Sequence, residues 1–271
     1  MFLEFWLNSV AVILGLIEAL FPHNAMIPDP PPLGSLRLAT PDDVMRLGVV
    51  CTASFYYSEE FTWERIYHDQ YPQSTIVHYR NEAVEFINEP EFITLVIEDD
   101  YDTDESSKTN ATIPEDNGWE PPEKGTKVVV GMAVWKLESG SKRIGRFQNL
   151  TGNFPDVPEY DYKDVDMKRT EDFAKIVEAA EEKYIHGLPA MERIAVHPAY
   201  WRRGHGTQLA AWGVKLSDID GVDQGVLANS MGQKLFEHVG YELLDVISVP
   251  GDTRNPKGTD FAVLKHTAQP Q

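Results

Sequence analysis

Cysteine is almost absent from this chain of 271 residues, in which Cys51 is the only one. A single cysteine forms no intrachain disulfide, so an oxidising compartment would add nothing to the stability of the fold. This excludes the disulfide-rich secreted scaffolds and favours a cytoplasmic setting. None of the eight histidines lies at a spacing from cysteine or carboxylate residues that is typical of a metal site, so we expect no metal.

Basic residues are scarce relative to acidic ones. Lysine and arginine number 24 against 43 aspartate and glutamate residues, which gives a formal charge of −19. Such a field repels phosphate backbones and attracts cations, so we expect no nucleic-acid partner and a small-molecule amine as substrate. A strongly acidic surface also keeps proteins in solution, and this simpler explanation of the charge stays open.

No apolar run is long enough to span a bilayer. The uncharged stretch Phe5–Ile17 is bounded by Glu4 and Glu18, and no lysine or arginine precedes it. A membrane span needs about 20 apolar residues, and a signal peptide begins with positive charge. We therefore expect residues 1–30 to be an extension, in which a proline-rich lead follows an amphipathic helix that docks on the domain or on a partner. A role of this helix at a membrane is the alternative.

Residues 31–271 have the length and composition of one globular domain, since 42% of the chain is apolar and 25% is charged. We expect a short strand at Ser35–Ala39. Thr40-Pro-Asp-Asp then supplies a capping residue and a proline for a helix that runs to about Ser54. The aromatic residues between positions 55 and 71 suit a pocket wall or lid, and core packing explains them equally well.

Two strands are expected in the middle of the chain. The alternating apolar residues of Lys127–Leu137 predict a strand whose partner is Phe92–Ile97, and a helix around Val84–Ile87 precedes this pair.

Two insertions separate these elements from the C-terminal part. Residues 98–127 are rich in acids and poor in apolar side chains, which predicts a solvated hairpin insertion. A second insertion covers about residues 139–188. It begins irregularly and contains a helix at Arg169–Tyr184, whose apolar residues share one face.

A strand, a glycine-bearing turn and a helix follow one another after residue 190. Met191–Pro198 reads as a strand that ends at a proline, and Ala199–Gly206 is the turn. The apolar face of Leu209–Leu216 predicts a helix that begins at Thr207. Backbone amides at such a helix start, together with the helix dipole, hold anionic phosphate.

Two other phosphate-binding motifs are excluded because the residues that they require are not at the required positions. Arg202 and Arg203 add cationic donors to the turn. A dinucleotide fingerprint that starts at Gly204 needs a third glycine where Leu209 stands, and the Gly-Lys-Ser/Thr of a nucleotide-triphosphate loop occurs nowhere in the sequence.

Two motifs carry a resemblance to a known family. The run Ile194-Ala-Val-His-Pro-Ala-Tyr-Trp-Arg-Arg-Gly-His-Gly-Thr-Gln-Leu resembles the acetyl-CoA motif of GNAT acetyltransferases, a strand that leads into Gln/Arg-x-x-Gly-x-Gly/Ala. The run Asn229-Ser-Met-Gly-Gln-Lys-Leu-Phe-Glu-His-Val-Gly-Tyr is similar to the family's Asn-x-x-Ala/Gly-x-x-Leu-Tyr-x-x-x-Gly-Phe, at matching spacing. The firm resemblance covers about residues 190–241, and Leu36–Ser54 loosely matches the family's first strand and helix.

The resemblance implies an α/β (α+β) GNAT fold with a central mixed, mostly antiparallel twisted sheet, flanked by helices and splayed between its two central strands. It also implies acetyl-CoA or CoA as cofactor and direct attack of a small-molecule amine on the thioester. Strand main-chain groups would pair with the pantetheine arm, turn amides with the diphosphate, and Asn229 with the cofactor arm. The residues implied at the cofactor are Ile194, Ala195, Val196, Trp201, Arg202, Arg203, Gly204, His205, Gly206, Thr207, Asn229 and Phe236.

Two residues depart from the family pattern. Trp201 stands where the family has Gln or Arg, and we interpret it as a packed aromatic at the base of the loop, with Arg202 or Arg203 as the compensating donor. Phe236 stands where the family commonly has a Tyr that protonates the departing thiolate, and Phe has no proton to give. Another group or water then does so, or transferase activity is weak or lost.

The candidate bases come from the same stretch. Glu192 has the side-chain parity of Ile194 on the cofactor strand and could take the amine proton, although a salt-bridged strand-edge carboxylate is the alternative. His186, just before the strand, is the second candidate. His197 and His205 flank the turn, where they could touch phosphate or shuttle protons; solvated loop histidines are the alternative.

Two other functions stay open. The departures at Trp201 and Phe236 allow a GNAT-like protein that has lost transferase activity and serves as a ligand-binding or regulatory module. The scaffold could also catalyse a different small-molecule reaction, with residues 55–71 building the pocket.

Overall fold

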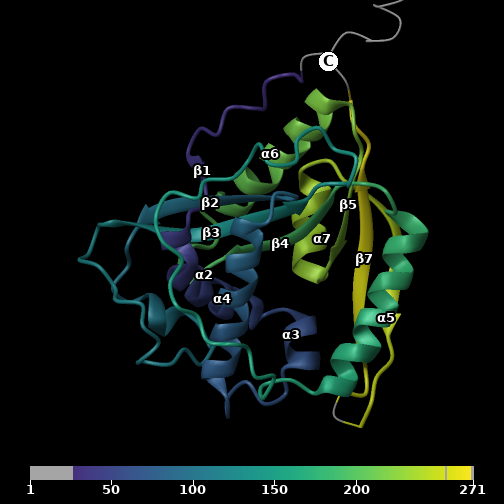
Figure 1. Cartoon of the computed structure of the whole chain (residues 1–271). Coiled ribbons are helices and arrows are strands. Elements are labelled where there is room, and N and C mark those ends of the chain that lie inside the picture. The colour runs from purple at the N-terminus through teal and green to yellow at the C-terminus, as the bar shows by residue number, and fades with distance from the viewer. Residues whose placement is uncertain (1–26, 254, 270–271) are drawn as a thin grey trace, which may run out of the picture.

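The computed structural model describes residues 27–253 and 255–269, so the amphipathic helix expected before residue 27 lies outside the described residues. Seven strands form one twisted sheet in the order β1-β2-β3-β4-β5-β7-β6 (Figure 1). Only β4 and β5 are parallel; all other neighbours are antiparallel. The expected mixed, mostly antiparallel sheet is confirmed. The strands are β1 (Leu36–Leu38), β2 (Phe92–Asp100), β3 (Lys127–Lys136), β4 (Ala190–Val196), β5 (Gln224–Ala228), β6 (Glu242–Val249) and β7 (Thr259–His266).

Helices flank this sheet. Three of them begin earlier than expected: α4 at Pro72, well before Val84, α5 at Met167, two residues before Arg169, and α6 at His205, two residues before Thr207. The helices are α2 (Val44–Phe55), α3 (Glu59–Glu64), α4 (Pro72–Asn88), α5 (Met167–Tyr184), α6 (His205–Asp220) and α7 (Ser230–His238), with three-residue or four-residue 3-10 helices η1 (Pro41–Asp43), η2 (Glu105–Lys108) and η3 (Pro198–Tyr200). No helix within the described part of the chain is long and apolar enough to cross a membrane.

The two faces of the sheet are covered by different helices because strand side chains alternate. Leu95 of β2 packs with α6 residues such as Leu209, whereas its neighbour Val96 packs with α2 and α4. At the other end of the sheet, α7 joins the α6 side, and α5 lies on the opposite side, where Phe173 meets Phe261 at a ring distance of 5.0 Å. The strands that follow residue 190 thus lie between two helical layers.

The sheet opens between β4 and β5. These parallel strands pair only where Ala190 lies beside Gly225 and Met191 beside Val226. Beyond this point β4 pairs only with β3, and β5 only with β7. The second half of β4 therefore has one edge without a strand partner, as the expected splay requires.

The acidic insertion is packed more tightly than expected. Glu105 is only 4% exposed and accepts two hydrogen bonds from Arg46, at 2.5 and 2.8 Å. Tyr200, just before the glycine turn, donates to the same carboxylate at 2.9 Å and accepts from the amide of Asp102 at 3.0 Å. The prediction of a solvated insertion is wrong here, because a buried arginine and a tyrosine compensate the charge of Glu105.

Candidate functional site

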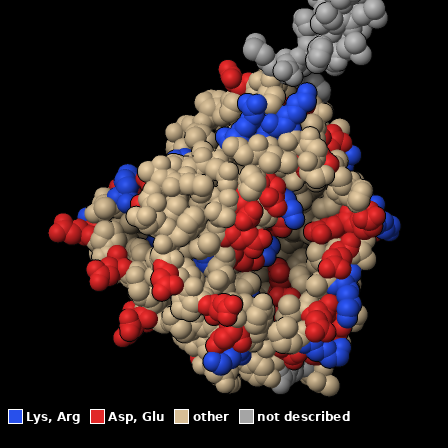
Figure 2. All heavy atoms as spheres, viewed as in Figure 1, with Lys and Arg blue, Asp and Glu red and all other residues tan. Residues whose placement is uncertain are grey.

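A cavity of about 1140 Å³ opens at the splay and is lined by β4, β5, α3, α5, α7 and the turn before α6. Figure 2 shows a hollow near the centre of this face, with acidic side chains gathered around it. Most of the site residues expected from the sequence line this cavity, and three, Arg203, His186 and His197, do not. Those that do are Glu192, Ile194, Ala195, Val196, Trp201, Arg202, Gly204, His205, Gly206, Thr207, Asn229 and Phe236.

The free edge of β4 exposes alternate main-chain groups to the cavity. The amide of His197 donates to the carbonyl of Val130 on β3 at 2.8 Å, so the alternation of an antiparallel ladder turns the main-chain groups of Ile194 and Val196 toward the gap. The Val196 carbonyl, however, already accepts a hydrogen bond of 2.6 Å from Nε1 of Trp201. One hydrogen bond leaves the second lone pair of this carbonyl and the amide of Val196 for a pantetheine arm, so that pairing stays a prediction.

The turn before α6 presents a row of backbone donors. Arg202 and Gly204 both have positive φ, 64° and 85°, and left-handed residues turn successive amides to one side of the chain. Gly204 also caps α6, since its carbonyl accepts the amide of Gln208 at 3.0 Å. The amides of residues 202–207 donate to no described residue. These free amides lie at the N-terminus of α6, where the helix dipole is positive, and this arrangement binds phosphate.

The two arginines of the turn differ in their engagement. Arg203 donates to Oδ2 of Asp99 at 2.8 Å, and Nε2 of His205 lies 3.0 Å from the same oxygen. Burial opposes ionisation of Asp99, but these partners and the amide of Asp100 lower its pKa, so it carries a full negative charge beside the turn. Arg202 is exposed, and its guanidinium contacts no described hydrogen-bond partner. Arg202 is thus a cation that is free to meet an anion in the cavity.

Trp201 is a packed aromatic at the base of the turn. Its ring lies edge-on to Tyr57 with centroids 5.0 Å apart, and its indole nitrogen makes the bond to Val196. The side chain therefore holds the turn against β4 and the loop after α2 instead of offering a donor to phosphate.

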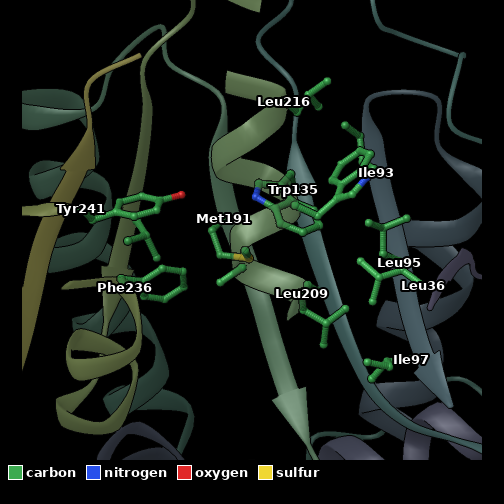
Figure 3. Close-up of a cluster of buried hydrophobic side chains, with 14 of the residues drawn as sticks. Leu36, Ile93, Leu95, Ile97, Trp135, Met191, Leu209, Leu216, Phe236 and Tyr241 are labelled. Carbon is green, nitrogen blue, oxygen red and sulfur yellow. The ribbon is translucent and has the colours of Figure 1, made fainter. Parts of the chain in front are cut away.

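The second motif lies on the opposite wall. Asn229 caps α7, because its Oδ1 accepts the amides of Met231 and Gly232 at 3.1 and 2.8 Å, and its Nδ2 donates to no described residue. Phe236 is 1% exposed and packs against Tyr241 at a ring distance of 5.1 Å. Figure 3 shows these two rings across from Met191 of β4. Asn229 can still offer an amide donor, whereas Phe236 offers only an apolar surface.

The inner part of the cavity is lined by carboxylates whose pKa is raised chiefly by burial. This holds for Glu60 and Glu64 on α3, for Glu181 on α5 and for Glu192 on β4. The pKa of Glu64 reaches about 7, with repulsion from Glu60 as the second cause. The carboxylate of Glu192 makes no ion pair with a described residue, so the alternative of a salt-bridged strand-edge group is not observed.

The candidate histidines are placed differently from one another. His186 is exposed, 2.8 Å from Glu182, and lines a separate hollow of about 390 Å³ that Glu192 also borders. His197 is fully buried, and burial lowers its pKa to about 4, so the interpretation as a solvated histidine is wrong. His205 is half-buried and paired with Asp99. Of these three histidines, His205 alone lines the large cavity, together with the four carboxylates.

The α3 carboxylates were not predicted as site residues from the sequence. Residues 55–71 were noticed only for their aromatic content, and Glu60 and Glu64 resemble any pair of glutamates one helical turn apart. Their position within that aromatic run could have indicated buried carboxylates, since apolar neighbours predict that a side chain is removed from water.

Comparisons with known proteins identify a relative that matches most of the chain. No family model matches the chain. Over 230 residues the chain is 33% identical to a protein named acetyltransferase from Stachybotrys chartarum (strain CBS 109288 / IBT 7711), and the match covers 84% of this chain and 89% of that protein.

Solved structures of acetyltransferases are similar to this chain at low sequence identity. A histone acetyltransferase HPA2 and related acetyltransferase from Corynebacterium glutamicum matches with a TM-score of 0.49 and 14% identity, over 88% of this chain and 98% of that one. A putative arylalkylamine N-acetyltransferase 7 from Aedes aegypti matches with a TM-score of 0.49 and 11% identity, over 85% of each chain.

The curated relative shares a third of its residues over most of both chains, and both motifs meet at one cavity in the splayed sheet. The chain therefore belongs to the GNAT superfamily of N-acetyltransferases, whose acyl donor is acetyl-CoA.

Proposed function

We propose that this protein transfers an acetyl group from acetyl-CoA to the amine of a small molecule by direct attack of the amine. The observation that carries the proposal is the single cavity that joins the free amides of residues 202–207 to the carboxylates of its inner wall. One end of this cavity suits a diphosphate, and the other end suits a cation. Bound acetyl-CoA would supply the activated acyl group between these two ends.

The chain's own groups would hold the cofactor as follows. The amides of residues 202–207 bind the diphosphate, and Arg202 adds a charge-assisted hydrogen bond. The main chain of Ile194 and the amide of Val196 pair with the pantetheine arm, and Asn229 offers its Nδ2. An amide on the free edge of β4 is also placed to stabilise the oxyanion that develops on the thioester carbonyl.

Proton transfer would use the inner carboxylates. Glu192 is one acceptor that the sequence identified, and His186 is outside the cavity that the substrates would share. Phe236 donates no proton, so the thiolate takes its proton from the amine nitrogen or from water; a thiol is an acceptable leaving group under these conditions.

The proposal is tested in two steps. Calorimetry should detect binding of CoA to the purified protein, and the absence of binding would refute the proposal. A CoA-release assay over a panel of small amines should then find turnover. Phe236→Tyr is expected to raise the rate if a hydroxyl at that position can reach the sulfur, and Glu192→Gln is expected to lower it.

A second function is favoured by one specific contact. Because Trp201 occupies the Val196 carbonyl and Phe236 lacks a hydroxyl, the protein could bind CoA as a ligand-binding or regulatory module without acyl transfer. This alternative predicts CoA binding without thiol release for every amine tested. Rapid thiol release with any one amine excludes it.

A further inference from the structure

Glu64 is a buried carboxylate without a protein partner. It is 9% exposed, lines the cavity, and neither oxygen makes a hydrogen bond or ion pair with a described residue. Glu60 precedes it by one turn of α3 and lines the same cavity. Buried charges in proteins are normally paired, so this side chain indicates a partner that comes from outside the chain.

The cations nearest to Glu64 are engaged elsewhere. Nη1 of Arg65 donates to Asp164 at 2.6 Å, and Nη2 of Arg193 donates to Glu82 at 2.7 Å. Each arginine therefore donates to another carboxylate, and neither forms a direct ion pair with Glu60 or Glu64. An ammonium group in the cavity would supply the missing positive charge.

The walls around these carboxylates are largely aromatic. Rings from α2, α3, α4, the second insertion and α5 border the same cavity, beside Val165 and Val177. Such walls bury a flat apolar body and leave its charged end to the few polar groups present. The rings include those of Phe55, Phe61, Tyr79, Tyr160 and Phe173.

We propose that Glu64, with Glu60 beside it, binds the ammonium group of a primary amine with a ring-bearing apolar body, and that Glu64 is the base for acetyl transfer. This assignment rests on the proposed function and adds the substrate class and the base. Glu64 takes one proton from the ammonium, and the neutral nitrogen then forms the bond to the acetyl carbon as the carbon–sulfur bond breaks. The second proton lost by nitrogen ends on sulfur as the thiol, and Glu64 returns its proton to solvent.

The ionisation of Glu64 suits this role. Burial raises its pKa to about 7, Glu60 and the more distant Glu82 act in the same direction, and Arg65 and Arg193 oppose it. A base with a pKa near the working pH is present in its charged form and still holds a proton effectively.

Glu192 is less suited to the same step. It borders both the large cavity and the smaller hollow, and Lys136 borders that hollow too. Lys136 and Arg193 both attract its charge, in opposition to the burial that raises its pKa. Glu192 therefore has Lys136 as a nearby cation, whereas the two arginines that attract Glu64 each donate to another carboxylate.

The first test measures binding. The complex of the protein with CoA is titrated with 2-phenylethylamine and with the neutral 2-phenylethanol, and the amine should bind at least about 10-fold more tightly. Glu60→Gln/Glu64→Gln should lose this preference while it binds CoA as tightly as the wild type does. Failure of the wild type to bind CoA would refute the proposed function. Normal CoA binding with equal affinity for amine and alcohol would refute the present assignment alone.

The second test measures turnover of 2-phenylethylamine from pH 5.5 to 9.5. Glu64→Gln should lower kcat/KM by about 100-fold or more and remove the acidic limb of the wild-type profile near pH 7, and Glu64→Asp should recover part of the rate. Glu178→Gln, an exposed glutamate of α5, is the matched control and should match the wild type. The assignment is overturned if the wild type does not turn over the probe, if Glu64→Gln keeps the limb, or if only Glu192→Gln removes it.

Discussion

The unpaired carboxylate of Glu64 should cost the folded protein stability at neutral pH. Its pKa is about 7 in the fold, against 4.5 for an unperturbed glutamate. Each unit of pKa difference corresponds to about 1.4 kcal/mol, so ionised Glu64 destabilises the fold by about 3 kcal/mol. Replacement by the neutral, nearly isosteric glutamine should recover most of this free energy.

The direction of the pKa shift of Glu64 determines the pH range over which it lowers the stability of the fold. A carboxyl group with a raised pKa binds its proton more tightly in the folded chain, so its contribution to the free energy of unfolding falls as pH rises from about 4.5 to about 7. Above pH 7 the penalty is complete. Glu64→Gln should therefore stabilise the protein by about 3 kcal/mol at pH 8 and by little at pH 5.

Urea denaturation of wild type and variant at pH 5 and pH 8, without amine or CoA, measures this difference. Thr62→Ala changes an exposed residue of the same helix that has no titrating group, and its effect on stability should be the same at both pH values. If Glu64→Gln changes the free energy of unfolding equally at pH 5 and pH 8, the carboxylate is not desolvated as argued.

Three further outcomes follow from the turn before α6. Arg202→Ala should weaken CoA binding in calorimetry by about 5-fold to 10-fold, because an exposed charged hydrogen bond contributes about 1 kcal/mol. Arg203→Ala should have a smaller effect, because the side chain of Arg203 already donates to Asp99. Gly204→Ala should lower the free energy of unfolding by about 1 kcal/mol, since its φ of 85° is strained for alanine. Trp201→Phe keeps the ring but loses the indole hydrogen bond, and it should cost about 1 kcal/mol in urea denaturation.

Local patterns were enough to predict the cofactor side of the molecule. The strand that ends at Pro198, the glycine turn and the apolar face of α6 are encoded within a short stretch, so their positions follow from neighbouring residues alone. The pair of β2 and β3 was likewise predictable from alternation and is confirmed. The roles of individual residues at the cofactor stay predictions.

Contacts between distant residues were not predictable in the same way. Glu105 was expected in solvent because its neighbours are polar, yet Arg46, 59 residues earlier, buries it. Asp99 looked like one acid among many and instead pairs with Arg203 across 104 residues. Propensity describes a segment, whereas the free energy of a buried charge depends on which partner the fold brings to it.

The difference between surface charge and buried charge also matters for the choice of substrate. A formal charge of −19 was a reason to expect an amine, but most of that charge is on the surface, where salt screens it within about 8 Å. Under the proposed function, the carboxylates that would discriminate are those that the fold removes from water, such as Glu64, whose interactions with a cation are screened far less. An entering ammonium group would relieve their unfavourable burial, so the free energy that destabilises the empty fold would become selectivity for a cation over a neutral molecule of the same shape.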